Sequence, residues 1–97
     1  MNIIKERLPV IELLCGLAEE AAELAQAALK LRRVFDGTNP TPATEEQAIE
    51  HLYEEIADTL LYIRQIDINF ESVDSIIAEK EELWKKRLEG VRTDGQR

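Results

Sequence analysis

The carboxylate residues of this chain gather in two helix-forming stretches. Glu19, Glu20 and Glu23 lie in the first stretch, and Glu55 and Asp58 lie in the second. Residues three or four positions apart share one face of a helix, so each stretch presents its acids as a group. The surrounding residues are mainly apolar, where a carboxylate is costly unless it is paired or bound to a metal. Two such groups facing each other would form an oxygen-rich site for a hard cation, and we expect Mg²⁺.

The alternative is that these acids are ordinary solvent-facing glutamates, because Glu is a good helix former. The position of Glu20 favours the metal site. At about 100° per residue, Glu20 falls at the edge of the apolar stripe that contains Leu17 and Leu24, so it should point towards the core. Four converging carboxylates would repel one another without a counter-ion. One or two Mg²⁺ ions would remove this repulsion and could activate water for displacement at a phosphoryl group.

Apolar residues at helical spacing predict the elements that position these acids. The pattern indicates three main helices, over about residues 9–35, 45–68 and 72–88. Gly37 and Gly90 are expected to end the first and third helices. Thr44 and Gln47 have the spacing of a capping box at the start of the second. The fold class predicted from these signals is all-α, a small helical bundle.

The length of the chain bounds its organisation. Ninety-seven residues make one domain, residues 1–97, with a helical core over about 9–88 and a frayed tail at 89–97. Such a core is too small to enclose much besides itself, so a second copy should complete a substrate pocket. The apolar run from Ile56 to Ile63 exceeds what three helices can cover, so we expect a dimer that forms a larger bundle.

The charge balance excludes several classes of partner. Acidic residues outnumber basic ones 20 to 12, and the net charge is −8. No basic stripe of useful length is present, so we expect no nucleic-acid partner. No apolar run approaches the roughly 20 residues of a membrane span, so we expect no membrane partner. Cys15 is the only cysteine and the N-terminus makes a poor signal peptide, which together predict a cytoplasmic protein.

Basic residues on the third predicted helix suggest a phosphate site. Lys80 and Arg87 share the stripe that contains Trp84, whereas Lys85 and Lys86 face away. Arg binds phosphate oxygens through its planar fork and Lys binds them as a point charge. The alternative is that Lys80 and Arg87 are snorkelling side chains or form salt bridges with the acids.

His51 precedes Glu55 by four residues and therefore shares a helix face with it. It could donate a hydrogen bond to the carboxylate of a metal ligand, or coordinate the ion itself. The alternative is an ordinary surface histidine beside a glutamate.

Together these residues carry a family resemblance. The order is Glu19-Glu20-x-x-Glu23, then Glu55-x-x-Asp58 on the next helix, then Lys80 and Arg87 seven residues apart on the helix after it. Over about residues 9–88 the chain resembles the MazG-like branch of the all-α NTP pyrophosphatase superfamily. The resemblance implies Mg²⁺-dependent hydrolysis of a nucleoside triphosphate to a monophosphate and pyrophosphate, in nucleotide-pool housekeeping. It also implies a homodimer or a dimer of dimers, and Mn²⁺ as a possible substitute for Mg²⁺.

The resemblance also assigns roles to individual residues. By position, the family's metal ligands match Glu20, Glu23, Glu55 and Asp58. Glu19 matches an acid that holds a second ion or the attacking water, so the expected catalytic residues are Glu19 and Glu20. The expected substrate-binding residues are Lys80, Trp84 and Arg87, where Trp84 stands at a position at which relatives often have a nucleotide-contacting Asn.

Two other functions fit the same sequence. One is a catalytically silent helical interaction module that keeps its acids for solubility or partner binding. The other is an enzyme similar to phosphoribosyl-ATP pyrophosphohydrolase.

Overall fold

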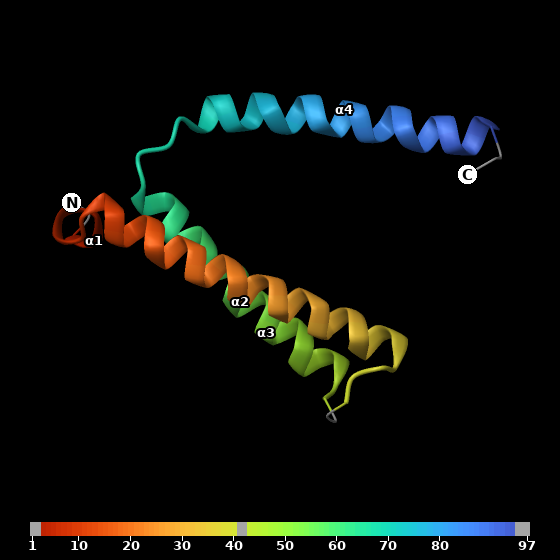
Figure 1. Cartoon of the computed structure of the whole chain (residues 1–97), viewed down its shortest axis with the longest axis horizontal. Coiled ribbons are helices and arrows are strands. Elements are labelled where there is room, and N and C mark those ends of the chain that lie inside the picture. The colour runs from red at the N-terminus through yellow and green to blue at the C-terminus, as the bar shows by residue number, and fades with distance from the viewer. Residues whose placement is uncertain (1–2, 41–42, 95–97) are drawn as a thin grey trace. The chain divides into compact units, whose positions relative to one another are not determined.

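The computed structural model describes residues 3–40 and 43–94. Four helices account for most of these residues: α1 (Ile3–Arg7), α2 (Val10–Asp36), α3 (Glu45–Gln65) and α4 (Phe70–Asp94) (Figure 1). No strand occurs in the described ranges, so the all-α prediction is confirmed. The short helix α1 was not predicted, because five residues are too few to establish a helical period.

The predicted end of the first long helix is confirmed. Gly37 has a left-handed backbone with φ of +76°, a conformation that glycine adopts without steric cost. The amides of Gly37 and Thr38 donate hydrogen bonds to the carbonyls of Val34 and Arg33, respectively. These bonds satisfy carbonyls that the helix end would otherwise leave unpaired. At the other end Pro9 is the N-cap, so α2 begins one residue after the predicted start.

The predicted capping box at the start of α3 is also confirmed. The Thr44 hydroxyl accepts a hydrogen bond from the Gln47 amide at 3.1 Å, and the Gln47 side chain accepts one from the Thr44 amide at 3.1 Å. The helix ends at Gln65, short of the predicted residue 68, because the backbone of Ile66 is extended.

The boundaries of the third predicted helix differ from those of α4. The helix begins at Phe70 because the side chain of Asn69 accepts a hydrogen bond from the Ser72 amide at 3.1 Å. The prediction that Gly90 ends this helix is wrong, since α4 continues to Asp94. A glycine in a helix interior costs only about 1 kcal/mol relative to Ala. Part of the predicted frayed tail is therefore helical, and residues 95–97 lie outside the described residues.

Helices α2 and α3 lie side by side as an antiparallel hairpin, within the first of two compact units, Met1–Asp67 (Figure 1). Two contacts define their register. The ring of Tyr62 lies against Gly16, where a Cβ atom would be only 2.2 Å from Cε1 of the ring. The Thr59 hydroxyl lies 3.4 Å from the carbonyl oxygen of Glu20. This register places Glu55 opposite the α2 turn that carries Glu20 and Glu23. The second unit, Ile68–Arg97, contains α4.

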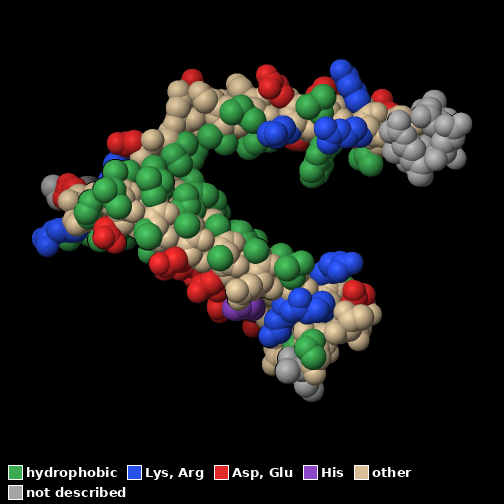
Figure 2. Space-filling model, in the orientation of Figure 1, with side chains coloured by type: hydrophobic (Ala, Val, Ile, Leu, Met, Phe, Trp, Pro, Cys, Tyr) green, Lys and Arg blue, Asp and Glu red, His purple; other side chains and the backbone are tan. Residues whose placement is uncertain are grey.

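The hairpin buries few large apolar side chains. Its buried hydrophobic residues are Leu13, Ala27 and Ala48, and the buried polar ones are Glu55, Thr59 and Gln65. Large apolar side chains are instead exposed along both helices, among them Leu14, Leu29, Ile56, Leu60 and Leu61 (Figure 2). The hairpin therefore places polar groups between its helices and leaves apolar surface outside. No described helix combines the length and apolar character that crossing a bilayer requires.

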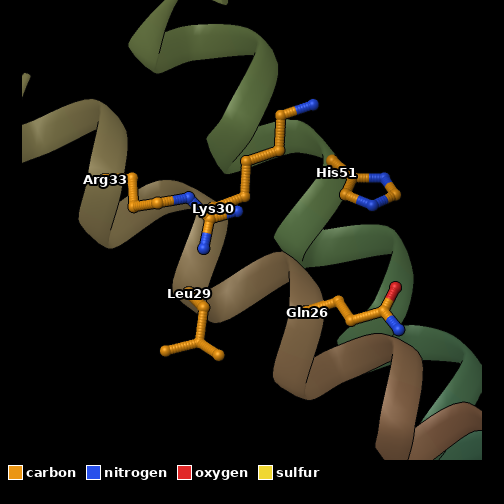
Figure 3. Close-up of a pocket in the computed structure, with 5 residues that line it drawn as sticks. All are labelled: Gln26, Leu29, Lys30, Arg33 and His51. Carbon is orange, nitrogen blue, oxygen red and sulfur yellow. The ribbon is translucent and has the colours of Figure 1, made fainter. Parts of the chain in front are cut away.

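Of the hollows on the described surface of the hairpin, two bear on the position of the candidate site. One hollow, of about 430 Å³, is lined by Gln26, Leu29, Lys30, Arg33 and His51 (Figure 3). The other, of about 250 Å³, is mainly apolar and is lined by Ile4, Leu8, Leu61, Tyr62 and Gln65. Neither is lined by the predicted metal ligands.

Candidate metal centre

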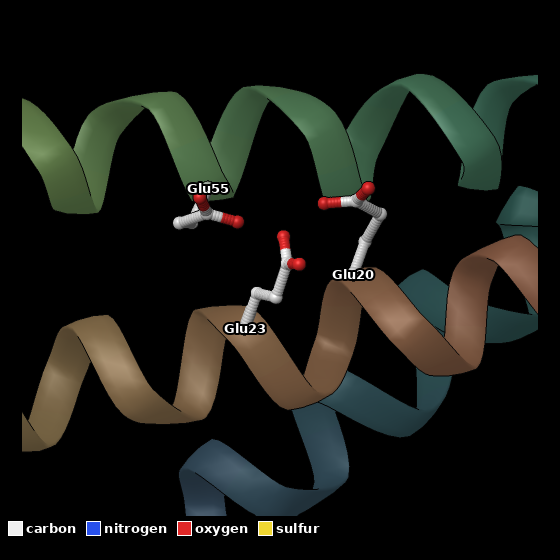
Figure 4. Close-up of side chains that lie close together, drawn as sticks. All are labelled: Glu20, Glu23 and Glu55. Carbon is white, nitrogen blue, oxygen red and sulfur yellow. The ribbon is translucent and has the colours of Figure 1, made fainter.

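Three of the predicted metal ligands converge between α2 and α3. Glu20 and Glu23 project from α2, and Glu55 projects from α3 towards them (Figure 4). One carboxylate oxygen from each residue lies within 4.8 Å of those from the other two. The two acidic motifs, far apart in the sequence, therefore meet in one cluster because the hairpin is antiparallel.

Two oxygens of this cluster are buried without a hydrogen-bond donor. Glu55 is 8% exposed and Glu20 is half-buried, whereas Glu23 is exposed. The Oε2 atoms of Glu20 and Glu55 are buried and accept no hydrogen bond from the described residues. A buried polar atom that lacks a partner costs on the order of 1–3 kcal/mol, and more when it is charged. The stability of the hairpin alone does not account for this arrangement.

The electrostatics of the cluster reflect the same burial. Burial raises the pKa of Glu20 and of Glu55 above the ordinary value for a glutamate, and the negative charges of Glu23 and Asp58 raise both further. His51 has a smaller effect, lowering the pKa of Glu55. Desolvation and like-charge repulsion thus both oppose ionisation of the two buried carboxyl groups.

The donor set fits a hard divalent cation. Magnesium prefers oxygen ligands at about 2.0–2.1 Å, so two ligands on opposite sides of one ion lie roughly 4.2 Å apart. Oxygens within 4.8 Å of one another need only a small closure to reach that spacing. A cation would also supply the charge that the orphaned oxygens of Glu20 and Glu55 lack. The residues that could hold it are Glu20, Glu23 and Glu55.

The remaining predicted site residues lie outside this cluster. Asp58 is exposed and is not one of the three converging ligands, although its charge acts on Glu20 and Glu55. Glu19 is exposed, next to Glu20 on α2. The predicted substrate-binding residues Lys80, Trp84 and Arg87 are exposed on α4, in the second compact unit.

Sequence reasoning missed one residue that positions the cluster. Thr59 is 8% exposed and lies on α3 one turn after Glu55. Its hydroxyl lies 2.8 Å from the carbonyl oxygen of Glu55 and 3.4 Å from that of Glu20. It therefore links the backbones of both helices at the residues that carry the buried carboxylates. The sequence signal that could have identified Thr59 is its spacing. It is a polar residue four positions after Glu55 and therefore lies on the same face of the helix.

Sequence reasoning placed His51 on the same helix face as Glu55 but missed the hollow that it shares with Lys30 and Arg33. Lys30 and Arg33 lie further along α2 than the carboxylates, and His51 precedes Glu55 on α3 by one turn. All three line the hollow of about 430 Å³. Their convergence depends on the register of the hairpin, which apolar spacing within one helix does not reveal.

The hairpin therefore carries two adjoining sites of opposite charge. The carboxylate cluster offers oxygen ligands of the kind that divalent cations take, and the hollow is lined by Lys30, Arg33 and His51, which offer N–H donors. Comparison of the chain with protein-family models, with curated proteins and with solved structures found no match in any of the three.

Proposed function

We propose that this protein is a Mg²⁺-dependent nucleotide pyrophosphohydrolase, which converts a nucleoside triphosphate and water to a monophosphate and pyrophosphate. The observation that carries the proposal is the pair of buried carboxylate oxygens, one each from Glu20 and Glu55, that no described group satisfies. Carboxylates in such a setting are typical of metal or catalytic sites, where stability is exchanged for function. Glu23 completes a three-carboxylate cluster.

The order of the motifs supports a nucleotide as the substrate. Glu19-Glu20-x-x-Glu23 on α2 is followed by Glu55-x-x-Asp58 on α3 and by Lys80 and Arg87 on α4. This is the arrangement for which the chain resembles MazG-like pyrophosphatases. Mg²⁺ also commonly binds phosphate chains. When few carboxylates coordinate the ion, it keeps open coordination positions that phosphate oxygens can occupy.

The residues have distinct proposed roles. Glu20, Glu23 and Glu55 hold the ion, and Asp58, whose charge acts on two of them, adds negative potential or a fourth ligand. The bound ion would polarise phosphate oxygens and favour ionisation of water. Mn²⁺, which also accepts oxygen ligands, would be a substitute.

In the reaction, Glu19 accepts a proton from the attacking water. The water oxygen bonds to the α-phosphorus, the bond from that phosphorus to the bridging oxygen breaks, and pyrophosphate leaves. Lys80 and Arg87 bind phosphate oxygens, and Trp84 stacks on the base.

The proposed assembly is a cytoplasmic homodimer or dimer of dimers. Its support is the apolar surface of the hairpin, where Leu60 is 43% exposed and Leu14 is 51% exposed. An interface that covered these residues would bury surface that the chain alone leaves in water.

The same apolar surface also favours a second function, a catalytically silent helical interaction module. An enzyme similar to phosphoribosyl-ATP pyrophosphohydrolase is a third possibility that shares the chemistry of the first. Substrate use separates the three. The interaction module hydrolyses nothing, whereas the third enzyme would act on phosphoribosyl-ATP in preference to free nucleotides.

A panel of nucleotides tests the proposal. Canonical and modified triphosphates, diphosphates and phosphoribosyl-ATP are incubated with the protein and Mg²⁺, and released pyrophosphate and phosphate are measured separately. We expect pyrophosphate as the product for the unmodified protein and for Glu50→Gln, a control at an exposed position of α3. Glu55→Gln should be inactive. Inactivity of the unmodified chain across the panel would favour the interaction module.

A further inference from the structure

The hollow at the loop end of the hairpin is lined by cationic and amide side chains. Gln26, Leu29, Lys30 and Arg33 come from α2, and His51 comes from α3 (Figure 3). Among the described residues no acidic side chain lines it, and its volume is about 430 Å³. The single histidine of the chain lies beside Lys and Arg side chains on this part of the surface (Figure 2).

Positive charge is concentrated in this part of α2. Acidic residues outnumber basic ones 20 to 12, yet Lys30, Arg32 and Arg33 occur almost consecutively. Among the described residues, a salt bridge joins Lys5 to Asp67. Neither Lys30 nor Arg33 forms a salt bridge with a described carboxylate. The nearby acid, Asp36, accepts hydrogen bonds from the hydroxyl and amide of Thr38. These bonds chiefly lower the pKa of Asp36, and the charges of Arg32 and Arg33 lower it further.

The helix dipole accounts for only part of this pattern. Arg33 lies in the last turn of α2, where a cation is favoured by the partial negative charge of the helix end. Lys30 precedes that turn, and His51 lies on the N-terminal half of α3, where the dipole favours no cation. Their meeting in one hollow therefore requires another reason, and an anionic ligand provides one.

The hollow adjoins the carboxylate cluster along the same two helices. Gln26 and Lys30 follow Glu23 by three and seven residues, which keeps them on one face of α2. At 1.5 Å per residue, Lys30 is about 10 Å from Glu23 along the helix axis. His51 precedes Glu55 by one turn of α3, so the two side chains lie on one face of that helix.

We propose that this hollow binds the terminal phosphate groups of the substrate, those that leave as pyrophosphate. The inference rests on the proposed function and adds a phosphate site that belongs to the same compact unit as the carboxylates. The guanidinium of Arg33 can bind two phosphate oxygens at once, and Lys30 adds a compact positive charge. Gln26 and His51 supply further N–H donors. Leu29 forms an apolar wall beside them.

Binding of inorganic tripolyphosphate in the presence of EDTA tests this site without any metal or turnover. The chain has one histidine, so the ring-proton NMR signals of His51 report directly on the hollow. We expect a saturable shift of these signals in the full-length protein. Lys30→Ala and Arg33→Ala should each weaken binding by about tenfold or more, as loss of a charged hydrogen bond predicts. Arg33→Lys keeps the charge but lacks the fork, so its affinity should be intermediate.

Arg32→Ala is the matched control, because it removes the same charge from an exposed neighbour that does not line the hollow. It should change the affinity by less than about twofold, the effect of an exposed charge. Absence of saturable binding would overturn the site. An Arg32→Ala effect as large as that of Arg33→Ala would also overturn it, since it would show non-specific attraction.

Glu55→Gln separates this inference from the proposed function. The variant should lose nucleotide hydrolysis but still bind tripolyphosphate, because Glu55 does not line the hollow. If the unmodified protein binds tripolyphosphate at His51 but hydrolyses no nucleotide, the anion site stands and the pyrophosphohydrolase proposal falls. If it hydrolyses nucleotides but Lys30→Ala and Arg33→Ala leave KM unchanged, the enzyme stands and this phosphate site falls.

Discussion

The hydroxyl of Thr59 on α3 lies 3.4 Å from the backbone carbonyl oxygen of Glu20 on α2. The same hydroxyl lies 2.8 Å from the carbonyl oxygen of Glu55, one turn earlier on its own helix. One buried side chain thus joins the backbone segments that carry the two buried carboxylates. The hydroxyl proton is shared between the two carbonyl oxygens, and the shorter bond is the one within α3.

Replacement of Thr59 by Val should loosen this link. The shape of the side chain is kept while its hydroxyl is lost, so the free energy of unfolding should fall by about 1 kcal/mol, the worth of a typical hydrogen bond. Urea denaturation in EDTA measures this change. Mg²⁺ affinity should also fall, because Glu20 is no longer held against α3. Thr59→Ser keeps the hydroxyl and should largely restore Mg²⁺ affinity; equal affinities for Val and Ser would contradict the positioning role.

Removal of one buried charge should have opposite effects on metal-free stability and on metal binding. Glu55→Gln relieves repulsion within the cluster, so its metal-free form should be at least as stable as the unmodified protein. Mg²⁺ at a hundredfold excess over its Kd should stabilise the unmodified protein by about 2.7 kcal/mol, and the variant much less. Thermal denaturation with and without Mg²⁺ measures both. An early-melting variant together with no Mg²⁺ shift in the unmodified protein would identify the carboxylates as structural.

The metal-free protein should lose stability as the pH rises. Burial, followed by the charges of Glu23 and Asp58, raises the folded-state pKa of Glu20 and of Glu55 above the unfolded value. The stability that these two groups contribute is therefore full below their unfolded pKa, near 4.5, and is lost as the pH rises through the folded pKa.

Comparison with the double variant Glu20→Gln/Glu55→Gln isolates this effect. Urea denaturation in EDTA should show that the stability of the unmodified protein, measured relative to the double variant, falls as the pH increases from about 4.5. The lowered pKa of Asp36, caused by its hydrogen bonds from Thr38, cancels in the difference. Parallel pH profiles for the two proteins would refute the raised pKa values of Glu20 and Glu55.

The contact between Gly16 and Tyr62 should be sensitive to a single methyl group. A Cβ atom at residue 16 would lie 2.2 Å from the Tyr62 ring, so Gly16→Ala must displace that ring. We expect a loss of about 1–3 kcal/mol from overpacking, partly offset by the better helix propensity of Ala. Chemical denaturation measures the change, and Tyr62→Leu should reduce it. Gly90→Ala, which meets no atom within 4 Å, should be neutral or stabilising.

The proposed dimer should depend on the exposed apolar face of α3. Light scattering at micromolar concentration should give the mass of a dimer or tetramer. Leu60→Lys places a charge where the side chain is now 43% exposed, so it should shift the protein towards monomer. Glu46→Lys, at an exposed position in the first turn of α3, should leave the mass unchanged. A monomeric unmodified protein would argue against a site shared between copies.

Local signals in the sequence were sufficient to predict the facing ends of α2 and α3 and the inward position of Glu20. Gly37 and the Thr44–Gln47 pair predict helix ends because their hydrogen bonds involve only neighbouring residues. Glu20 could be predicted to point towards the core because its angular position relative to Leu17 and Leu24 depends on α2 alone. These features do not require knowledge of what packs against α2.

Features that depend on two elements could not be predicted in this way. Periodicity gave Glu55 and Asp58 the same role, yet Glu55 is buried and Asp58 is exposed. Asp58 lies about 60° around α3 from Glu55, at the edge of the face that meets α2, and the width of the buried face depends on the partner helix. The hollow at Lys30, Arg33 and His51 depends on the register between the helices. That register follows from contacts such as Gly16–Tyr62, which sequence spacing alone does not specify.

The ends of α2 and α3 that face the loop are closed by separate sets of hydrogen bonds, at Gly37 and at Thr44. The two helices are aligned by contacts further along, at Tyr62 and Thr59. Neither these caps nor the cross-helix contacts depend on the length of the segment between Gly37 and Thr44. Its length can change in evolution or by engineering while the carboxylates stay in place. The number of residues between Glu23 and Glu55 is consequently a poor criterion for recognising related proteins. The residue pairs that meet across the two helices, Gly16–Tyr62 and Glu20–Thr59, are a stringent criterion.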